Sequence, residues 1–200
     1  MNLLNRAFQY VILTSKKYNI DESHSIKHSI EVLTLAKKIY KSELINNAFL
    51  IDHYDIICIA SILHDMCDKK YMNENQGICE MKAFMNEYIN IIELDIIVQI
   101  IQTMSYSKVK INGYPQLNEY QLAYHIVREA DLLAAYDIDR CTIYGLMVEN
   151  FTFSDAIIRA KELFINRVLE YRKDNLFITT YSKELSFELH HKSIQNLDYI

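Results

Sequence analysis

The chain has 200 residues, of which 50% are hydrophobic and 24% are charged, and this composition suits one globular domain with a buried core. A net charge of -5 argues against a protein that binds duplex nucleic acid, because that affinity depends on clustered lysine and arginine. Three glycines and one proline leave few strand turns or helix breakers, so the sequence predicts an all-α, single-domain helical bundle over residues 1–200.

The cysteines and the apolar segments predict where the protein resides. Four cysteines occur without a Cys-x-x-Cys pair, which is typical of free thiols in a reducing compartment. No basic segment followed by an apolar core opens the chain, and no apolar stretch reaches the roughly 20 residues that a membrane span needs. We therefore expect a soluble cytoplasmic protein without a membrane partner.

Two amphipathic helices are predicted at the start of the chain. The first, over residues 3–17, has apolar residues every three or four positions. The second runs from a cap at Asp21 or Ser23 to about Tyr40. His28 shares the apolar stripe of this second helix and therefore points into the core. There it serves either as a metal ligand or as a core histidine bonded to a backbone carbonyl.

His24 competes with His28 for the ligand role. It lies one turn earlier on the same face, and two histidines at positions i and i+4 are themselves a zinc-binding geometry. Its place at the frayed start of the helix favours a position nearer the surface. There His24 would support a ligand or contact a phosphate group.

A buried helix ends in a histidine and an aspartate. Residues 56–63 are apolar or small on every side, which predicts a helix that is buried all round, and His64 and Asp65 follow it directly. A carboxylate in the interior is stable only if it is paired, protonated or bound to a metal. We interpret the adjacent His64 and Asp65 as one wall of a metal site.

Asp68 follows His64 by one turn and shares its face if the helix continues. It would then act as a general base, or it would pair with Lys69 or Lys70 at the end of the helix. Both lysines open a loop beside the predicted site, where an ammonium group can meet phosphate oxygens.

The middle of the chain is predicted to contain two helices and a long loop. The helices cover residues 74–88 and 94–104, and the loop covers residues 105–118 and contains a glycine and a proline. Its Tyr106 and Lys108 have the composition of a lid that stacks a base and touches phosphates, although a plain exposed loop has the same composition.

A second buried carboxylate is expected at Asp131, on the apolar face of a helix over residues 119–136. A buried carboxylate requires a cation, and Arg128 offers an ordinary salt bridge. A metal shared with His64 and Asp65 accounts for more of the pattern.

Three more helices are expected to close the core. They cover residues 139–150, residues 154–173 with Ser154 as the N-cap, and a last segment marked by Leu185, Leu189 and Leu197. The sequence shows no internal repeat and no domain linker.

The polar residues assembled so far resemble the signature of the HD-domain metal-dependent phosphohydrolase superfamily. That signature consists of one His, then a His-Asp pair, then a distant Asp, and it is matched by His28, His64, Asp65 and Asp131. The local contexts are similar to those of small bacterial HD hydrolases, some of which act on nucleotides: His-x-x-x-His-x-x-x-Val from residue 24, Leu-His-Asp-x-x-Asp-x-Lys from residue 63, Met-Ser-Tyr-Ser from residue 104 and Ala-Asp at residue 130. The resemblance covers residues 21–150 and leaves residues 151–200 as helices that complete the bundle.

The chain departs from that branch at two positions. An acidic residue commonly follows the last Asp by three positions, where this chain has Ala134, and Glu31 replaces a frequent arginine. Relatives with two metals need further histidine ligands, for which the sequence has no well-placed candidates. We therefore expect one metal ion.

The resemblance implies a metal-dependent phosphohydrolase that cleaves phosphate or pyrophosphate from a small phosphorylated substrate, with a nucleotide as the expected substrate. One divalent ion among Mn, Mg, Fe, Co, Ni and Zn is expected on His28, His64, Asp65 and Asp131. Asp65 and Asp68 are assigned to catalysis. Substrate contacts are expected from His24, Lys69, Lys70, Tyr106 and Lys108. The alternatives are a non-catalytic nucleotide sensor and a metal-dependent oxidative enzyme with a di-iron site.

Overall fold

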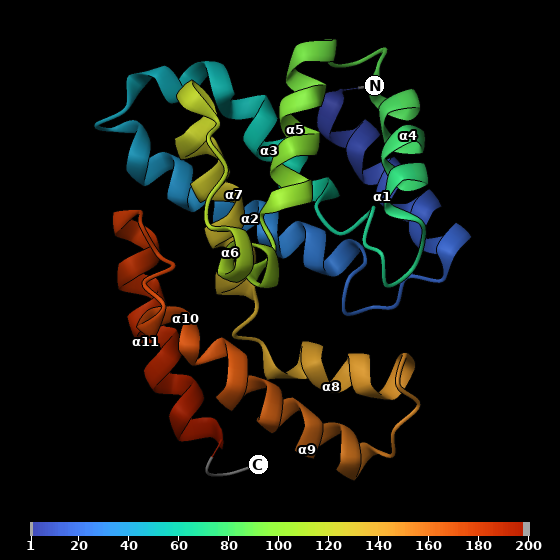
Figure 1. The fold of residues 1–200 in the computed structure, drawn as a ribbon, viewed down its shortest axis with the longest axis vertical. Helices are drawn as coiled ribbons and strands as arrows, with labels where there is room; N and C mark the ends of the chain where they lie inside the picture. The colour runs from blue at the N-terminus through green and yellow to red at the C-terminus, as the bar shows by residue number, and fades with distance from the viewer. Residues whose placement is uncertain (1, 198–200) are drawn as a thin grey trace.

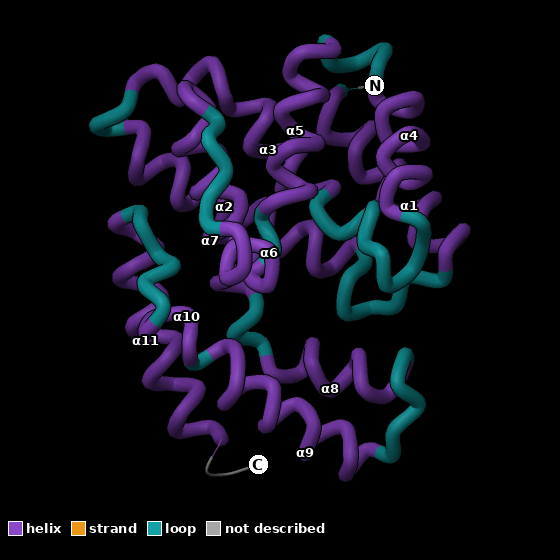
Figure 2. The backbone as a smooth tube through the Cα atoms, in the orientation of Figure 1, coloured by secondary structure: helices purple, strands orange, loops and turns teal. Residues whose placement is uncertain are grey.

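The structure, a computed structural model, describes residues 2–197 and contains helices and loops but no strand in that range (Figure 2). This confirms the predicted all-α fold. The elements, in chain order, are α1 (Leu3–Tyr18), α2 (Ile26–Leu44), the 3-10 helix η1 (Ala48–His53), α3 (Tyr54–Leu63), α4 (Glu74–Met85), α5 (Ile91–Thr103), α6 (Tyr106–Asn112), the 3-10 helix η2 (Asn118–Tyr120), α7 (Gln121–Ala134), α8 (Ile138–Met147), α9 (Phe153–Leu163), the π-helical turn η3 (Phe164–Val168), α10 (Glu170–Lys173) and α11 (Thr180–Leu197).

Helix α3 lies at the centre of the bundle and packs against α1, α2, α5 and α7 (Figure 1). All of its residues from Ile56 to Leu63 are buried, as the sequence predicts. Its isoleucines are β-branched and only moderate helix formers, so burial rather than intrinsic propensity stabilises this helix. Each fully buried isoleucine contributes about 1.5 to 3 kcal/mol relative to an exposed one.

Helices α2 and α7 pack on each other and on α3. The buried face of α2 carries His28, Val32 and Ala36 at the spacing of one helical turn. Helix α7 is buried along nearly its whole length from Ala123 to Ala134. This three-helix contact brings the first turn of α2, the end of α3 and the last turn of α7 together.

Helices α8 and α9 form a hairpin that lies below α1–α7 in the view of Figure 1. A glycine permits their close approach, because a Cβ atom at Gly145 would lie 3.1 Å from the Cβ atom of Ala156. The turn η3 and α10 follow α9, and α11 then returns along α2 and α7.

The predicted loop over residues 105–118 is wrong in its first half, where Tyr106–Asn112 forms α6. Tyr106 and Val109 bury one face of this short helix, and Gly113 ends it with a φ of 72°. The glycine and the proline of the segment favoured a loop in the sequence, and two apolar residues three positions apart were too few to indicate a helix.

Two predicted helix starts also differ from the structure. Neither Asp21 nor Ser23 caps α2, which begins after Ser25, because the Asp21 carboxylate instead accepts the backbone N–H of Ser23 at 2.9 Å within a turn. The N-cap of α9 is Thr152 rather than Ser154. The helix predicted over residues 154–173 is interrupted by the π-helical turn η3.

The cysteines are free thiols. Cys58 and Cys67 are buried, Cys141 is half-buried and Cys79 is exposed. Within residues 2–197, no helix combines the length and the apolar character that a membrane crossing requires.

Candidate metal centre

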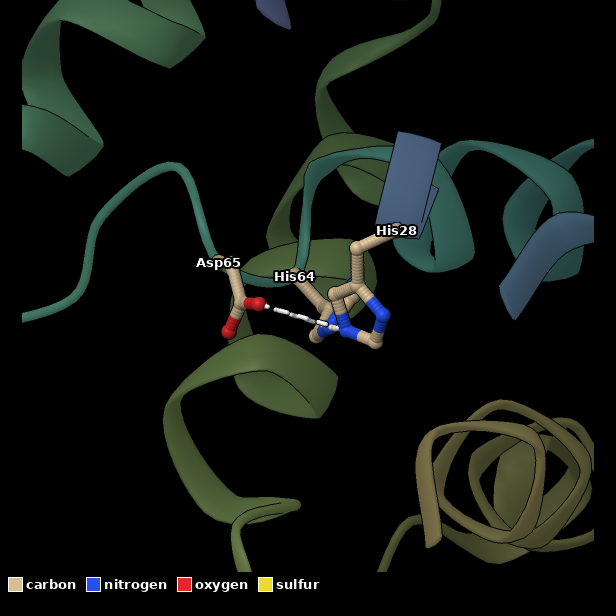
Figure 3. A group of neighbouring side chains, drawn as sticks. All are labelled: His28, His64 and Asp65. Atoms are coloured by element: carbon tan, nitrogen blue, oxygen red, sulfur yellow. Dashed lines mark hydrogen bonds and ion pairs between the residues drawn. The ribbon is translucent and has the colours of Figure 1, made fainter. Parts of the chain in front are cut away.

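Four side chains from three helical segments converge beside the end of α3, and Figure 3 shows three of them, His28, His64 and Asp65. The Nε2 atoms of His28 and His64 lie 3.0 Å apart. An oxygen of Asp65 lies 3.4 Å from Nε2 of His28 and 3.2 Å from Nε2 of His64. An oxygen of Asp131 lies 3.3 Å and 3.5 Å from the same two nitrogen atoms. We refer to these four residues as the His-Asp group.

Each member of the His-Asp group lies near a helix end. His28 is in the first turn of α2, Asp131 is in the last turn of α7, and His64 directly follows α3. Asp65 belongs to a turn that is closed by a backbone hydrogen bond of 2.9 Å from Met66 to Leu63. The buried run of α3 therefore carries both polar side chains to the point where the three helices meet.

The hydrogen bonding of His64 determines which of its nitrogen atoms faces the group. Nδ1 of His64 lies 2.9 Å from the carbonyl oxygen of Ser61. A carbonyl oxygen only accepts hydrogen bonds, so Nδ1 carries a proton and Nε2 is the nitrogen atom that faces the other three residues. A carbonyl on the outer nitrogen is a common way to orient a metal-binding histidine.

Asp65 has a buried oxygen without a donor. Within residues 2–197, Oδ2 of Asp65 accepts no hydrogen bond, and Nδ1 of His28 is likewise buried without a partner. Arg128, the sequence-based alternative partner of Asp131, instead forms an ion pair of 3.2 Å with Glu129. A buried carboxylate oxygen without a donor is costly unless a cation lies beside it.

The electrostatics of the group favour two anions around a positive charge. Burial raises the pKa of Asp65, but the charge of His64 outweighs burial and holds that pKa below its usual range. Burial likewise opposes ionisation of Asp131, yet hydrogen bonds from His28 and His64 hold its pKa well below the usual value. Burial lowers the pKa of His64, but the carboxylates of Asp65 and Asp131 raise it to about 10.

The donor set and its spacing fit one divalent ion. Atoms that bind one first-row ion at about 2.0 to 2.3 Å lie about 2.8 to 3.8 Å from one another, depending on the number of ligands. Five of the six separations within the His-Asp group, all except that between Asp65 and Asp131, run from 3.0 to 3.5 Å. The side chains of His28 and His64 are only 1% and 3% exposed, whereas those of Asp65 and Asp131 are 15% and 26% exposed. The group is therefore open to solvent on its carboxylate side.

His24 lies beside the His-Asp group, and both of its ring nitrogen atoms have other partners. Nδ1 lies 2.6 Å from Oγ of Ser23 and 3.1 Å from the hydroxyl of Tyr71, while Nε2 lies 3.3 Å from Nζ of Lys70. Its ring centroid is 6.4 Å from that of His28. His24 is half-buried, and its predicted roles of supporting a ligand or contacting a phosphate stay predictions.

Asp68 does not lie on a continuation of α3, because that helix ends at Leu63. Its carboxylate accepts the backbone N–H of Lys70 at 2.9 Å and lies 3.2 Å from Nζ of the same residue. Of the two predicted lysine partners, Lys70 is therefore the one in contact, and Lys69 is exposed. The role of Asp68 as a general base stays a prediction.

Tyr106 and Lys108, the predicted substrate contacts from the third segment, have their contacts elsewhere in the described residues. Lys108 forms an ion pair of 2.9 Å with Glu74 at the start of α4. The hydroxyl of Tyr106 donates to Asp174 at 3.0 Å. No hydrogen bond or ion pair joins either side chain to the His-Asp group within residues 2–197, so their predicted role gains no support from this arrangement.

Helix α8 contributes residues that the sequence did not indicate. Nε of Arg140 donates to the carbonyl oxygen of Ser23 at 2.7 Å, across 117 positions of the chain. The ring of Tyr144, one turn later, lies 5.6 Å from the ring of His24. The i and i+4 spacing of these two residues was the only available signal, and such spacing does not reveal what a helix face contacts.

The comparisons with known proteins bear on the fold. A crystal structure of a protein from Lactobacillus plantarum, a structural-genomics target, is similar with a TM-score of 0.75 and 20% identity over 98% of this chain and 94% of that chain. No protein-family model matches the sequence, and no curated protein matches it either. At 20% identity this similarity concerns the fold alone.

Proposed function

We propose that this protein is a metal-dependent phosphohydrolase of the HD type, with one divalent ion on His28, His64, Asp65 and Asp131. The supporting observation is the convergence of imidazole and carboxylate atoms: the Nε2 atoms of His28 and His64 lie 3.0 Å apart, and the buried Oδ2 atom of Asp65 lies 3.2 Å from Nε2 of His64. These atoms are close enough to share one positive charge, which is a second proton on His64 in the metal-free protein and would be a divalent ion in the metal-bound protein.

The chain's own residues would bind an anionic substrate beside this centre. A bound divalent ion would lower the pKa of a water molecule and polarise a phosphoryl group. Asp68 would orient or deprotonate the attacking water, since it follows the His64-Asp65 pair in the turn. The side chain of Lys70 is 43% exposed, and its ammonium group lies beside His24, where it can neutralise phosphate oxygens.

The expected substrate is a nucleotide, and the expected location is the cytoplasm. Phosphate recognition follows from the cations at the site, whereas the nucleotide follows only from the resemblance to small HD hydrolases. The free thiols suit a reducing compartment.

Metal analysis and a substrate screen test the proposal together. The purified protein, loaded with Mn, Mg, Fe, Co, Ni or Zn in turn, is incubated with nucleoside mono-, di- and triphosphates, and released phosphate and pyrophosphate are measured. We expect about one ion per chain and hydrolysis that chelation abolishes. In Asp65→Ala the metal content and the hydrolysis should fall in parallel, because a lost anionic ligand weakens the ion and leaves His64 unsupported.

Asp95→Ala is the matched control, because Asp95 is half-exposed and pairs with Lys82 at 2.6 Å away from the site. It should retain both metal and activity. Undiminished hydrolysis by metal-free Asp65→Ala would contradict metal catalysis. Metal-dependent nucleotide binding without turnover would indicate a sensor instead.

A further inference from the structure

A chain of hydrogen bonds connects two loops beside the His-Asp group. The loop before α2 contains Asp21 and His24, and the loop between α3 and α4 contains Lys70 and Tyr71. The ring of His24 contacts Lys70 through one nitrogen atom and Tyr71 through the other. The side chains of Asp21 and His24 are only 5% and 11% exposed. Polar groups that are buried to this extent depend on one another for hydrogen bonds.

The ammonium group of Lys70 determines the tautomer of His24. Nζ of Lys70 lies 3.3 Å from Nε2 of His24. An ammonium group only donates hydrogen bonds, so Nε2 presents a lone pair and the proton of the neutral ring is on Nδ1. Nδ1 lies 2.6 Å from Oγ of Ser23 and 3.1 Å from the hydroxyl oxygen of Tyr71. Both hydroxyl oxygens can accept from this N–H group.

Asp21 determines where the hydroxyl proton of Tyr71 points. The hydroxyl of Tyr71 donates to Oδ2 of Asp21. A hydroxyl group has one proton, so the oxygen atom of Tyr71 is left to accept from Nδ1 of His24. Oδ2 itself lies 3.9 Å from Nδ1, which is beyond hydrogen-bond distance, so Tyr71 bridges the two residues. The buried carboxylate therefore favours the same tautomer of His24 that accepts from Lys70.

The two oxygen atoms of Asp21 have different partners. Oδ1 accepts the backbone N–H of Ser23 at 2.9 Å, and Oδ2 accepts from Tyr71. Asp21→Asn would keep an amide oxygen on the N–H of Ser23 and would direct its NH2 group, which only donates, to the hydroxyl oxygen of Tyr71. Tyr71 would then donate to Nδ1 of His24. The ring proton would move to Nε2, where it faces the ammonium group of Lys70.

The ammonium group of Lys70 has one N–H group left for a substrate. Of its three N–H groups, one is directed to His24 at 3.3 Å and one to Asp68 at 3.2 Å. No other hydrogen bond or ion pair of this Nζ atom occurs in the described residues, and the side chain is 43% exposed. Two acceptors that hold a long side chain in advance reduce the entropy that it loses when it binds a phosphate group.

We propose that Asp21 and Tyr71 are positioning residues, which hold the ammonium group of Lys70 ready for a substrate phosphate group by fixing the tautomer of His24. Both residues act through His24 rather than on the substrate. The inference rests on the proposed function for the role of Lys70. Its two measurable consequences, the tautomer of a ring and the binding of inorganic phosphate, do not require turnover.

The tautomer is measured by nitrogen NMR of zinc-loaded protein labelled at its histidines, with His24→Gln used to assign the His24 signals. The wild type should carry the ring proton on Nδ1, and Asp21→Asn should carry it on Nε2. In Tyr71→Phe the bridge is missing and Ser23 still accepts, so the proton should stay on Nδ1. Addition of Asp21→Asn to Tyr71→Phe should then leave the tautomer unchanged.

The binding of inorganic phosphate to the zinc-loaded protein is measured by titration calorimetry. Asp21→Asn should weaken it by about tenfold, because an N–H group of His24 that faces Lys70 removes one of the two anchors of the ammonium group. Tyr71→Phe should weaken it by about threefold, since the ring of His24 loses one of its two acceptors. Lys70→Met should weaken it by at least about tenfold, and addition of Asp21→Asn to Lys70→Met should cause no further loss.

Tyr18→Phe is the matched control, because it removes a tyrosine hydroxyl that donates to the carboxylate of Glu80 at 2.9 Å. It should leave the tautomer and the phosphate affinity unchanged. Metal content and melting temperature are measured for every variant. If Asp21→Asn does not fold, the wild-type tautomer and the phosphate affinity of Tyr71→Phe provide the test.

A proton on Nε2 of His24 in the wild type would overturn the inference, and so would an unchanged tautomer or an unchanged phosphate affinity in Asp21→Asn. If Asp21→Asn has both expected effects but no phosphate compound is hydrolysed, the proposed function fails and the positioning role stands. If hydrolysis occurs and Asp21→Asn has neither effect, the positioning role is wrong and the proposed function stands.

Discussion

At the level of single residues, Lys70 connects two parts of the candidate site. Its Nζ atom lies 3.2 Å from the carboxylate of Asp68 and 3.3 Å from Nε2 of His24. Burial lowers the pKa of His24 to about 4, and the charges of Lys70 and Arg140 act in the same direction. The charge of Asp65 acts in the opposite direction but does not outweigh them, so the His24 ring is neutral at pH 7. A neutral His24 accepts from the ammonium group of Lys70 and holds it beside the His-Asp group.

The role of Asp68 can be separated from metal binding by one substitution. We expect Asp68→Asn to retain the metal and to lower the turnover rate by about 10²- to 10⁴-fold, the usual contribution of a general base. Turnover, metal content and melting temperature are measured on the same preparation, with Asp95→Asn as the surface control. A near-normal rate would mean that Asp68 only positions Lys70, and the stability cost would then be at most about 1 kcal/mol.

His125 is a buried histidine outside the His-Asp group. Nε2 of His125 accepts from the side-chain amide of Gln121 at 3.2 Å, and Nδ1 has no partner within the described residues. Burial, followed by the charge of Arg128, lowers its pKa to about 4. Because the unfolded chain then binds more protons than the folded chain below about pH 6.5, acidification from that pH toward pH 4 favours unfolding.

Comparison of the wild-type protein with His125→Phe isolates this effect. Between pH 7.5 and pH 5, the free energy of unfolding of the wild type should fall by about 2 kcal/mol more than that of the variant. Urea denaturation of both proteins in chelator, at the two pH values, gives this difference. Parallel pH dependences would show that His125 keeps an ordinary pKa in the folded protein.

At the level of elements, a buried carboxylate holds the segment before α11 against α7. Glu129, which is 0% exposed, accepts the backbone N–H groups of Ile178 at 2.8 Å and of Thr179 at 3.1 Å, and the Thr179 hydroxyl at 2.7 Å. Arg128 pairs with Glu129 and also donates to the carbonyl oxygen of Leu176. The chain between α10 and α11 is thereby fixed to the helix that carries Asp131.

Removal of this carboxylate should strongly destabilise the protein. Glu129→Ala leaves Arg128 as an unpaired buried charge and leaves the N–H groups of residues 178 and 179 without an acceptor. We expect a loss of about 3 to 5 kcal/mol in the free energy of unfolding, measured by urea denaturation. Glu188→Ala, at an exposed position of α11, should change stability by no more than about 0.5 kcal/mol. A similar small change in Glu129→Ala would contradict the role of the network.

At the level of the whole molecule, the His-Asp group joins three helices that are distant in the chain. His28 belongs to α2, His64 and Asp65 follow α3, and Asp131 belongs to α7. An ion that binds all four residues binds the folded chain alone, because the unfolded chain does not hold the four side chains together. Metal binding should therefore stabilise the entire bundle.

Thermal unfolding measures this coupling. At a free metal concentration about 100-fold above the dissociation constant, stability should rise by about 2.7 kcal/mol, which corresponds to a melting temperature about 5 to 10 °C higher for a chain of this size. Asp65→Ala should show the same melting temperature with metal and with chelator. An equal increase in the wild type and in Asp65→Ala would indicate that the ion stabilises the protein elsewhere.

Much of the His-Asp group could be predicted, because a polar side chain buried on an apolar helix face costs free energy unless it has a partner. His28, His64 and Asp131 each occupy an apolar helical face, and this is visible within a few residues of sequence. The helix starts near residues 21 and 154 and the helix α6 were predicted wrongly. Nearby serine, threonine and aspartate side chains compete for the backbone N–H groups at a helix start. The residue that caps the helix therefore depends on the final chain path, which local sequence does not specify.

The sequence by itself determined the all-α class, the burial of residues 56–63 and the presence of polar residues on apolar helix faces, since periodicity is a local property. Only the tertiary structure decided that Arg140 reaches the carbonyl oxygen of Ser23. It also decided that Lys108 and Tyr106 turn to Glu74 and Asp174. Long flexible side chains on a helix surface carry no periodic signal, and their partners depend on how distant helices pack.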